Sequence, residues 1–112
     1  MSVRIAVLGA GRIGQVHARA IAGHDATVLT AIADPVAAAA NAIAEQYGCD
    51  VRTIDEIAVS DDVDGVIICT PTDTHADLIE QFARSEKAIF CEKPIDLSVD
   101  RVRACLDVVN QT

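Results

Sequence analysis

The stretch Val3-Arg4-Ile5-Ala6-Val7-Leu8-Gly9-Ala10-Gly11-Arg12-Ile13-Gly14 decides the fold. An apolar run ends in the pattern Gly-x-Gly-x-x-Gly and passes directly into a helical pattern. In such a turn the first glycine permits a sharp bend, the second lets a pyrophosphate approach the backbone, and the third lets the helix pack on the strand. The start of the helix then offers free N–H groups and a positive dipole end to phosphate. The pattern predicts dinucleotide binding through Gly9, Gly11, Arg12, Ile13 and Gly14, and the alternative is a structural turn that merely needs glycine.

Asp34 supports the dinucleotide interpretation, because it closes the next strand-like run, Thr27 to Ala33, twenty residues after Gly14. A carboxylate at this spacing binds the hydroxyls of the adenosine ribose. It would repel a 2′-phosphate, and Pro35-Val36-Ala37 offers no arginine to hold one, so the sequence predicts NAD rather than NADP. Asp34 could also cap the next helix, with Pro35 at its first position, and a carboxylate has enough acceptor sites for both roles.

The composition predicts one globular domain over residues 1–112, since 51% of the residues are hydrophobic and 23% are charged. The net charge of −8 opposes binding to nucleic acid and to anionic membranes. No apolar run approaches the roughly 18 residues of a membrane span, and the first residues lack a signal-peptide layout. We therefore expect a cytoplasmic protein with neither kind of partner.

The cysteines lack the spacing of a metal site or a redox pair. None of Cys49, Cys69, Cys91 and Cys105 forms a C-x-x-C pair, and three lie in apolar segments. We expect buried thiols and no bound metal. The acidic run from Ser60 to Asp64 lacks the alternation of a calcium loop and is expected to be a solvated connection.

Five strand-like runs alternate with helical patterns joined by short connections, which predicts an α/β domain with three layers. We expect a doubly wound parallel sheet of the Rossmann type, with strand order 3-2-1-4-5. Its first helix, about 12–22, is expected to bury a stripe of Ile13, Val16, His17, Ala20 and Ile21, and its last helix to bury Val99, Val102, Leu106 and Val109.

Ligands of such sheets bind at the carboxyl ends of the strands, where the strand order reverses. The loops there are 9–14, 70–75 and 92–96. They add Thr70, Pro71, His75, Glu92 and Lys93 to the predicted cofactor-binding residues. His75 is either a loop-capping histidine or a wall of the nicotinamide pocket. Lys93, flanked by Glu92 and Pro94, could hydrogen-bond a substrate hydroxyl as hydride leaves, and the alternatives are a surface lysine or a buried ion pair.

Three motifs together resemble the glucose–fructose oxidoreductase/inositol dehydrogenase (Gfo/Idh/MocA) family. They are the glycine turn with His17, the run Cys69-Thr70-Pro71-Thr72-Asp73-Thr74-His75, and Glu92-Lys93-Pro94. Within that family the chain looks most like the N-terminal NAD-binding domain of the bacterial inositol 2-dehydrogenases. The resemblance implies NAD-linked oxidation of a ring hydroxyl on a sugar or cyclitol, with Lys93 catalytic beside the substrate hydroxyl and His75 in the pocket wall.

The resemblance also implies a second domain, absent from this sequence, that supplies most substrate contacts and the proton acceptor. We therefore expect an N-terminal fragment that is monomeric and inactive alone, whereas a full-length parent would be an NAD-dependent dehydrogenase and a homo-oligomer acting on a small polyol. Two alternatives stay open at this point: a stand-alone dinucleotide-binding sensor without catalysis, and flavin binding through the same glycine pattern.

Overall fold

The computed structural model describes residues 2–91 and 98–111, and its core is a five-stranded parallel sheet. The strands β1 (Val3–Leu8), β2 (Thr27–Ala33), β3 (Asp50–Val51), β4 (Gly65–Ile68) and β5 (Ala88–Cys91) lie in the order β3-β2-β1-β4-β5. All four pairings are parallel, with β1 in the centre between β2 and β4. The predicted Rossmann-type sheet and its strand order are confirmed.

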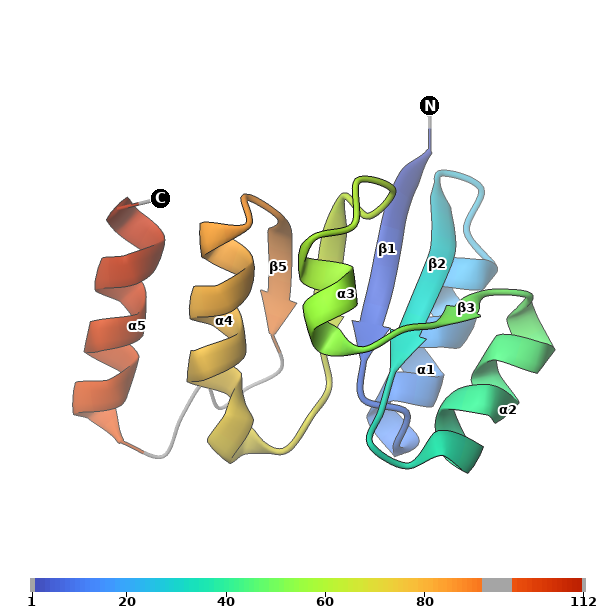
Figure 1. Cartoon of the computed structure of the whole chain (residues 1–112), viewed down its shortest axis with the longest axis horizontal. Helices are drawn as coiled ribbons and strands as arrows, with labels where there is room; N and C mark the ends of the chain where they lie inside the picture. The colour runs from blue at the N-terminus through green and yellow to red at the C-terminus, as the bar shows by residue number, and fades with distance from the viewer. Residues whose placement is uncertain (1, 92–97, 112) are drawn as a thin grey trace.

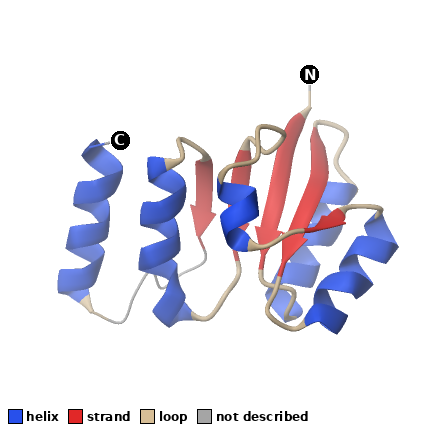
Figure 2. Cartoon of the chain, in the orientation of Figure 1, coloured by secondary structure: helices blue, strands red, loops and turns tan. Residues whose placement is uncertain are grey.

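Helices cover both faces of the sheet (Figure 2), which gives the three expected layers. The helices α1 (Arg12–Ala22) and α2 (Ala37–Tyr47) pack on one face against Val7, Leu29 and Ile32. On the other face, α3 (Ile54–Ala58), α4 (His75–Arg84) and α5 (Val99–Gln111) cover the side chains that alternate with these, such as Ala6 and Leu8. The alternation of inward residues along β1 is the two-residue period of a strand buried on both faces.

The buried stripe predicted for α1 is confirmed at Ile21 and is wrong at Ile13, Val16 and Ala20, which are exposed. Gly14, Ala18 and Ile21 face the sheet, whereas Ile13 is 48% exposed and Val16 is 59% exposed. Small residues on the contact side allow the helix to approach the strands closely, and this close approach turns the bulkier side chains outward. His17 lies beside Phe90 of β5, with ring centroids 5.6 Å apart.

The prediction for the last helix also fails, because only Cys105 of α5 is fully buried. Arg101 attaches α5 to α4 through ion pairs with Glu80 and Asp77. Val99 is 67% exposed and Leu106 is 48% exposed. The Ser98 hydroxyl, one residue before α5, accepts a hydrogen bond from the Arg101 N–H at 3.3 Å, as the side chain of a capping residue does.

Candidate dinucleotide site

The loops predicted to form the site leave the sheet at one edge. Because every strand is parallel, the carboxyl ends of β1, β2, β4 and β5 point the same way, toward the bottom of Figure 1. The segments 9–11, 34–36 and 69–74 therefore lie at one edge of the sheet. Glu92 and Lys93, predicted for the same edge, lie outside the described residues.

The glycine turn has the geometry that its sequence requires. Gly9 has φ +103°, and a Cβ there would lie 2.7 Å from the Cys69 carbonyl oxygen. A Cβ on Gly14 would lie 1.8 Å from the carbonyl oxygen of Gly9. A Cβ on Gly11 would meet no protein atom within 4 Å. Gly9 and Gly14 are thus required by the fold, whereas Gly11 faces open space that a ligand could occupy.

Helix α1 begins directly after this open space. Gly11 is its N-cap residue in extended conformation, and the first turn, Arg12-Ile13-Gly14-Gln15, contains no acidic residue. Arg12 and Ile13 are both exposed. The positive end of the α1 dipole is therefore not neutralised by its own side chains, and its first N–H groups favour an anion.

Asp34 joins the end of β2 to the glycine turn. Its Oδ2 accepts a hydrogen bond from the Ala10 N–H at 2.6 Å, and its Oδ1 accepts one from the Val36 N–H at 2.7 Å. The second contact is a local turn, because α2 begins at Ala37 with Val36 as its N-cap residue. The predicted cap at Asp34 is therefore shifted by two residues. The half-buried carboxylate keeps further acceptor positions toward solvent, as a ribose contact requires.

A hollow of about 490 Å³ opens beside Asp34 at the ends of β2 and β3. The sequence interpretation assigned no role to the segment after β3, although the predicted strand order already places that segment next to Asp34. The hollow is lined by both segments, through Ala33, Asp34, Pro35, Val51, Arg52, Thr53, Ile54, Asp55 and Glu56.

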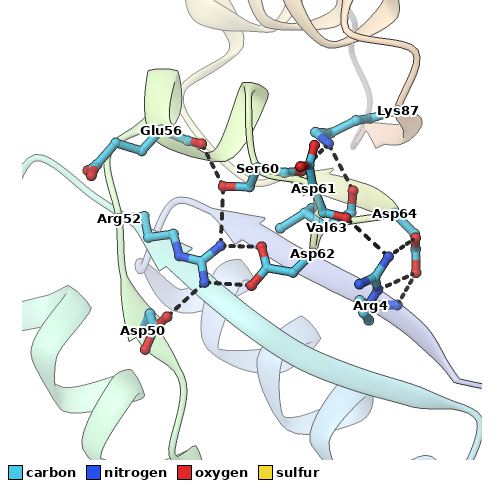
Figure 3. A network of polar contacts seen from close by, with 10 residues as sticks. All are labelled: Arg4, Asp50, Arg52, Glu56, Ser60, Asp61, Asp62, Val63, Asp64 and Lys87. Carbon is cyan, nitrogen blue, oxygen red and sulfur yellow. Dashed lines mark hydrogen bonds and ion pairs between the residues drawn. The ribbon is translucent and has the colours of Figure 1, made fainter.

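Arg52 fixes the β3–α3 connection that lines this hollow (Figure 3). Its guanidinium donates to both carboxylate oxygens of Asp62, at 2.7 and 2.8 Å, and to Asp50 at 2.8 Å. These hydrogen bonds raise the pKa of Arg52 and lower the pKa of Asp62. A bidentate guanidinium–carboxylate pair has a fixed geometry, so this ion pair orients the β3–α3 connection as well as stabilising it.

The acidic run from Ser60 to Asp64 is a connection with exposed carboxylates, as expected, and cations from three separate segments also bind it. Besides Arg52, Arg4 of β1 pairs with Asp64 at 2.9 Å, and Lys87 donates to the carbonyl oxygens of Ser60 and Val63 at 2.8 and 2.9 Å (Figure 3). The carboxylates of this run tie it to β1 and to the β3–α3 connection, and its backbone carbonyl oxygens tie it to the residue before β5.

The loop after β4 is closed by its own hydroxyl and imidazole groups. His75 is 3% exposed, and its Nε2 lies 2.7 Å from the Thr70 carbonyl oxygen. Thr74 ends the 3-10 turn Thr72–Thr74, and its hydroxyl reaches back to the two residues before the turn. It contacts the Pro71 carbonyl oxygen and the Thr70 hydroxyl, each at 2.6 Å. Of the two roles left open for His75, this geometry favours the loop-holding one. Pro71 is exposed and Thr70 half-buried at the edge.

The rest of the described chain adds no competing centre. Among residues 2–91 and 98–111, no three histidine, cysteine or acidic side chains gather in a way that could hold a metal ion. Within the same residues, no helix is long and apolar enough to cross a membrane. The four cysteines are thiols, with Cys105 buried and the other three half-buried, which is less burial than the sequence predicts.

The residues present fit a dinucleotide. Gly11 and the start of α1 would hold its pyrophosphate, and Asp34 would hold the adenosine ribose hydroxyls. A glycine turn, a helix start and a carboxylate at the switch point of a parallel sheet define a dinucleotide-binding Rossmann domain.

Comparison with known proteins assigns the family. Residues 3–112 match the model of the Gfo/Idh/MocA oxidoreductase family, described as an NAD-binding Rossmann fold, and the chain belongs to this family as an NAD-binding domain. It is 65% identical to an inositol 2-dehydrogenase of Rhizobium meliloti over 112 residues, which are 100% of this chain and 34% of that protein.

Two solved structures show the same fold. A myo-inositol dehydrogenase from Corynebacterium glutamicum is 43% identical with TM-score 0.92, over 99% of this chain and 34% of its own. A scyllo-inositol dehydrogenase from Lactobacillus casei, with bound NAD(H) and scyllo-inositol, is 28% identical with TM-score 0.93, over 99% and 34%. The chain thus spans about a third of the length of these relatives.

Proposed function

We propose that this domain, residues 1–112, is the cofactor-binding part of an NAD-dependent dehydrogenase that oxidises a ring hydroxyl of myo-inositol or a related cyclitol to a ketone. The observation that carries the proposal is the pairing of Asp34 with the glycine turn at the carboxyl edge, in a chain 65% identical to an inositol 2-dehydrogenase. The chain spans a third of that relative's length, so the substrate, the proton acceptor and the catalytic cycle are part of the proposal.

Each described residue of the proposed site has a physical task. Gly11 admits the pyrophosphate, the N–H groups of Arg12 and Ile13 at the start of α1 attract it, and Gly9 and Gly14 keep the turn tight. When bound, the nicotinamide ring accepts a hydride. Thr70 and Pro71 lie at the edge where that ring is expected, and His75 holds their loop in shape.

Lys93 remains the proposed catalytic residue, with Glu92 beside it. An ammonium group at the end of β5 would hydrogen-bond the substrate hydroxyl and stabilise its developing negative charge as hydride leaves. The proposed substrate is a small polyol, and the proposed location of the protein is the cytoplasm. The domain alone is proposed to be monomeric and the longer protein homo-oligomeric.

Titration of the domain with both cofactors tests the NAD assignment. The carboxylate of Asp34 accepts hydrogen bonds from ribose hydroxyls and repels a 2′-phosphate, so NAD is expected to bind more tightly than NADP. The variant Asp34→Ala should weaken NAD binding about 10- to 100-fold, because a hydrogen bond to a charged group contributes about 1.5–3 kcal/mol. Calorimetry measures both constants, and equal or tighter binding of NADP by the wild-type domain would contradict the proposal.

A further inference from the structure

Asp34 makes a contact that ribose recognition does not explain. Its Oδ2 lies 2.6 Å from the backbone nitrogen of Ala10, between the two glycines that shape the phosphate turn. Ala10 is 1% exposed, so its N–H is removed from water and needs a protein acceptor. The preceding amide, Gly9 N–H, instead donates to the Ala33 carbonyl oxygen at 2.7 Å, as a continuation of the ladder between β1 and β2.

We propose that Asp34 is a positioning residue for the glycine turn in addition to a ribose ligand, so that one carboxylate couples recognition of the ribose to the shape of the pyrophosphate site. Gly9 and Ala10 are where the chain leaves β1, with Gly9 at φ +103°. Past Gly9 the backbone has left the sheet ladder. Gln15 of α1 then donates to two carbonyl oxygens of the turn, from its Nε2 to Ala10 at 3.4 Å and from its backbone N–H to Gly11 at 2.9 Å. The Asp34 carboxylate holds the Ala10 N–H, which these contacts leave without an acceptor.

The carboxylate is itself fixed in direction. Its other oxygen, Oδ1, accepts the Val36 N–H at 2.7 Å, so the side chain is held from both sides. A carboxylate has about four acceptor positions, so two remain for ribose hydroxyls after these two backbone contacts. A ribose hydroxyl and the Ala10 amide would therefore both donate to the Asp34 carboxylate. Loss of this carboxylate would affect the ribose contact and the pyrophosphate turn together. This inference rests on the NAD-binding role of the domain.

The effect on the turn can be separated from the effect on the ribose with a ligand that lacks the hydroxyls. The probe is 2′,3′-dideoxy-ADP, which keeps adenine and the diphosphate. The variants Asp34→Ala and Asp34→Asn remove the same charge, but only Asn keeps an oxygen that can accept the Ala10 N–H. We expect Asp34→Asn to bind dideoxy-ADP about 2- to 10-fold more tightly than Asp34→Ala, the ratio that one net hydrogen bond gives.

A measurement without ligand keeps the proposal testable whatever the domain binds. Hydrogen exchange of the Ala10 amide should accelerate in Asp34→Ala and stay near the wild-type rate in Asp34→Asn, with the Gly9 amide as an internal control that changes in neither. Equal dideoxy-ADP affinity in the two variants, or an Ala10 amide that exchanges alike in all three proteins, overturns the positioning role. If no nucleotide binds wild-type protein while the exchange result holds, the cofactor assignment fails and the positioning role stands.

Discussion

At the scale of single residues, the three glycines of the turn differ in what depends on them. Gly14 is enclosed by the backbone of Gly9, whereas Gly11 borders open space. The same Gly-to-Ala change should therefore disturb folding at one position and ligand binding at the other. Because the substitution is the same at both positions, Gly11→Ala and Gly14→Ala serve as controls for each other.

We expect Gly14→Ala to destabilise the domain, because its Cβ would lie 1.8 Å from a carbonyl oxygen that cannot move without displacing β1. Overpacking of this kind costs about 1–3 kcal/mol or more. The free energy of unfolding of Gly11→Ala should lie within about 0.5 kcal/mol of the wild-type value, as for most surface substitutions. The same variant should bind NAD more weakly, by about 10-fold or more. Chemical denaturation and calorimetry measure the two effects. A stable Gly14→Ala protein, or tight NAD binding by Gly11→Ala, would contradict this division.

Lys93 is the residue on which the chemical proposal depends. In a full-length protein carrying this domain, Lys93→Ala should lower kcat at least about 100-fold, the scale of losing one positioned transition-state donor. NAD affinity should change little, because the contacts proposed for the adenosine and pyrophosphate are made by Asp34 and the glycine turn. Steady-state kinetics with cofactor titration separate the two, and near-normal turnover would identify Lys93 as a surface lysine.

At the scale of elements, the segment Ser60 to Asp64 shows how charge organises a connection. Three cations contact this one segment: Arg4 of β1, Arg52 directly after β3 and Lys87 directly before β5 (Figure 3). Exposed pairs individually contribute little to stability, but several that share one loop act as a network. The loop therefore sets where β4 begins relative to β1.

This network predicts a dependence of stability on pH. The Arg4 guanidinium and its backbone N–H lower the pKa of Asp64 from 3.8 to about 2. Because the unfolded state takes up its proton first as pH falls, the stabilisation is present above about pH 4 and is lost between about pH 4 and pH 2. The melting temperature should decline over this range, and the decline should be shallower in Asp64→Asn.

Arg4→Gln provides the matched control for the acid prediction. It removes the cation and leaves the carboxylate, so it should also flatten the decline, and the double variant should add little to either single change. If neither substitution alters the decline of the melting temperature with falling pH, then other carboxylates dominate the loss of stability in acid.

The α1 and α5 helices show where element-level reasoning from the sequence fails. Periodicity marks the bulky apolar residues, but Gly14 and Ala18 contact the sheet beside Ile21 in α1, and Cys105 is the buried residue of α5 among those described. In α4, by contrast, the bulky apolar residues Leu78, Ile79 and Phe82 are all buried. A helix that packs through small side chains exposes the adjacent large ones, and a hydrophobicity pattern alone does not reveal this.

At the scale of the whole molecule, the residues proposed to hold the adenosine and pyrophosphate of the cofactor all lie in the described chain. Asp34, the glycine turn and the hollow of about 490 Å³ lie together at one edge. Two large apolar side chains of the sheet remain exposed, Val3 of β1 at 48% and Phe90 of β5 at 53%. The domain has its own core on both faces of the sheet, which favours independent folding.

We expect the 112-residue protein to bind NAD, to bind ADP-ribose nearly as tightly, and to oxidise no polyol. Hydride transfer requires a substrate hydroxyl fixed near the nicotinamide and a base for its proton, and both are proposed to lie in a further domain. Calorimetry with NAD and ADP-ribose, alongside NADH absorbance with myo-inositol and glucose, checks this. Robust NADH production would show that these residues form a complete enzyme, and binding without turnover in any longer natural form would favour the sensor alternative.

The sequence by itself determined the fold class, the strand order, the glycine turn and the acidic residue that follows it. These are local patterns: a turn needs glycine where a Cβ would collide, and a buried parallel strand is apolar along its length. Short connections between alternating elements then leave few possible topologies, so the strand order follows from the same patterns.

Only the tertiary structure decided which atoms meet. Asp34 and Ala10 are far apart in the sequence, as are Arg4 and Asp64, and the register of parallel strands brings each pair together. Likewise His75 turns its ring into the Thr70 loop and α1 buries its small residues, because packing selects the faces that fit. Contacts between distant segments depend on how whole helices and strands are placed relative to one another, and the sequence pattern within one element does not specify that placement.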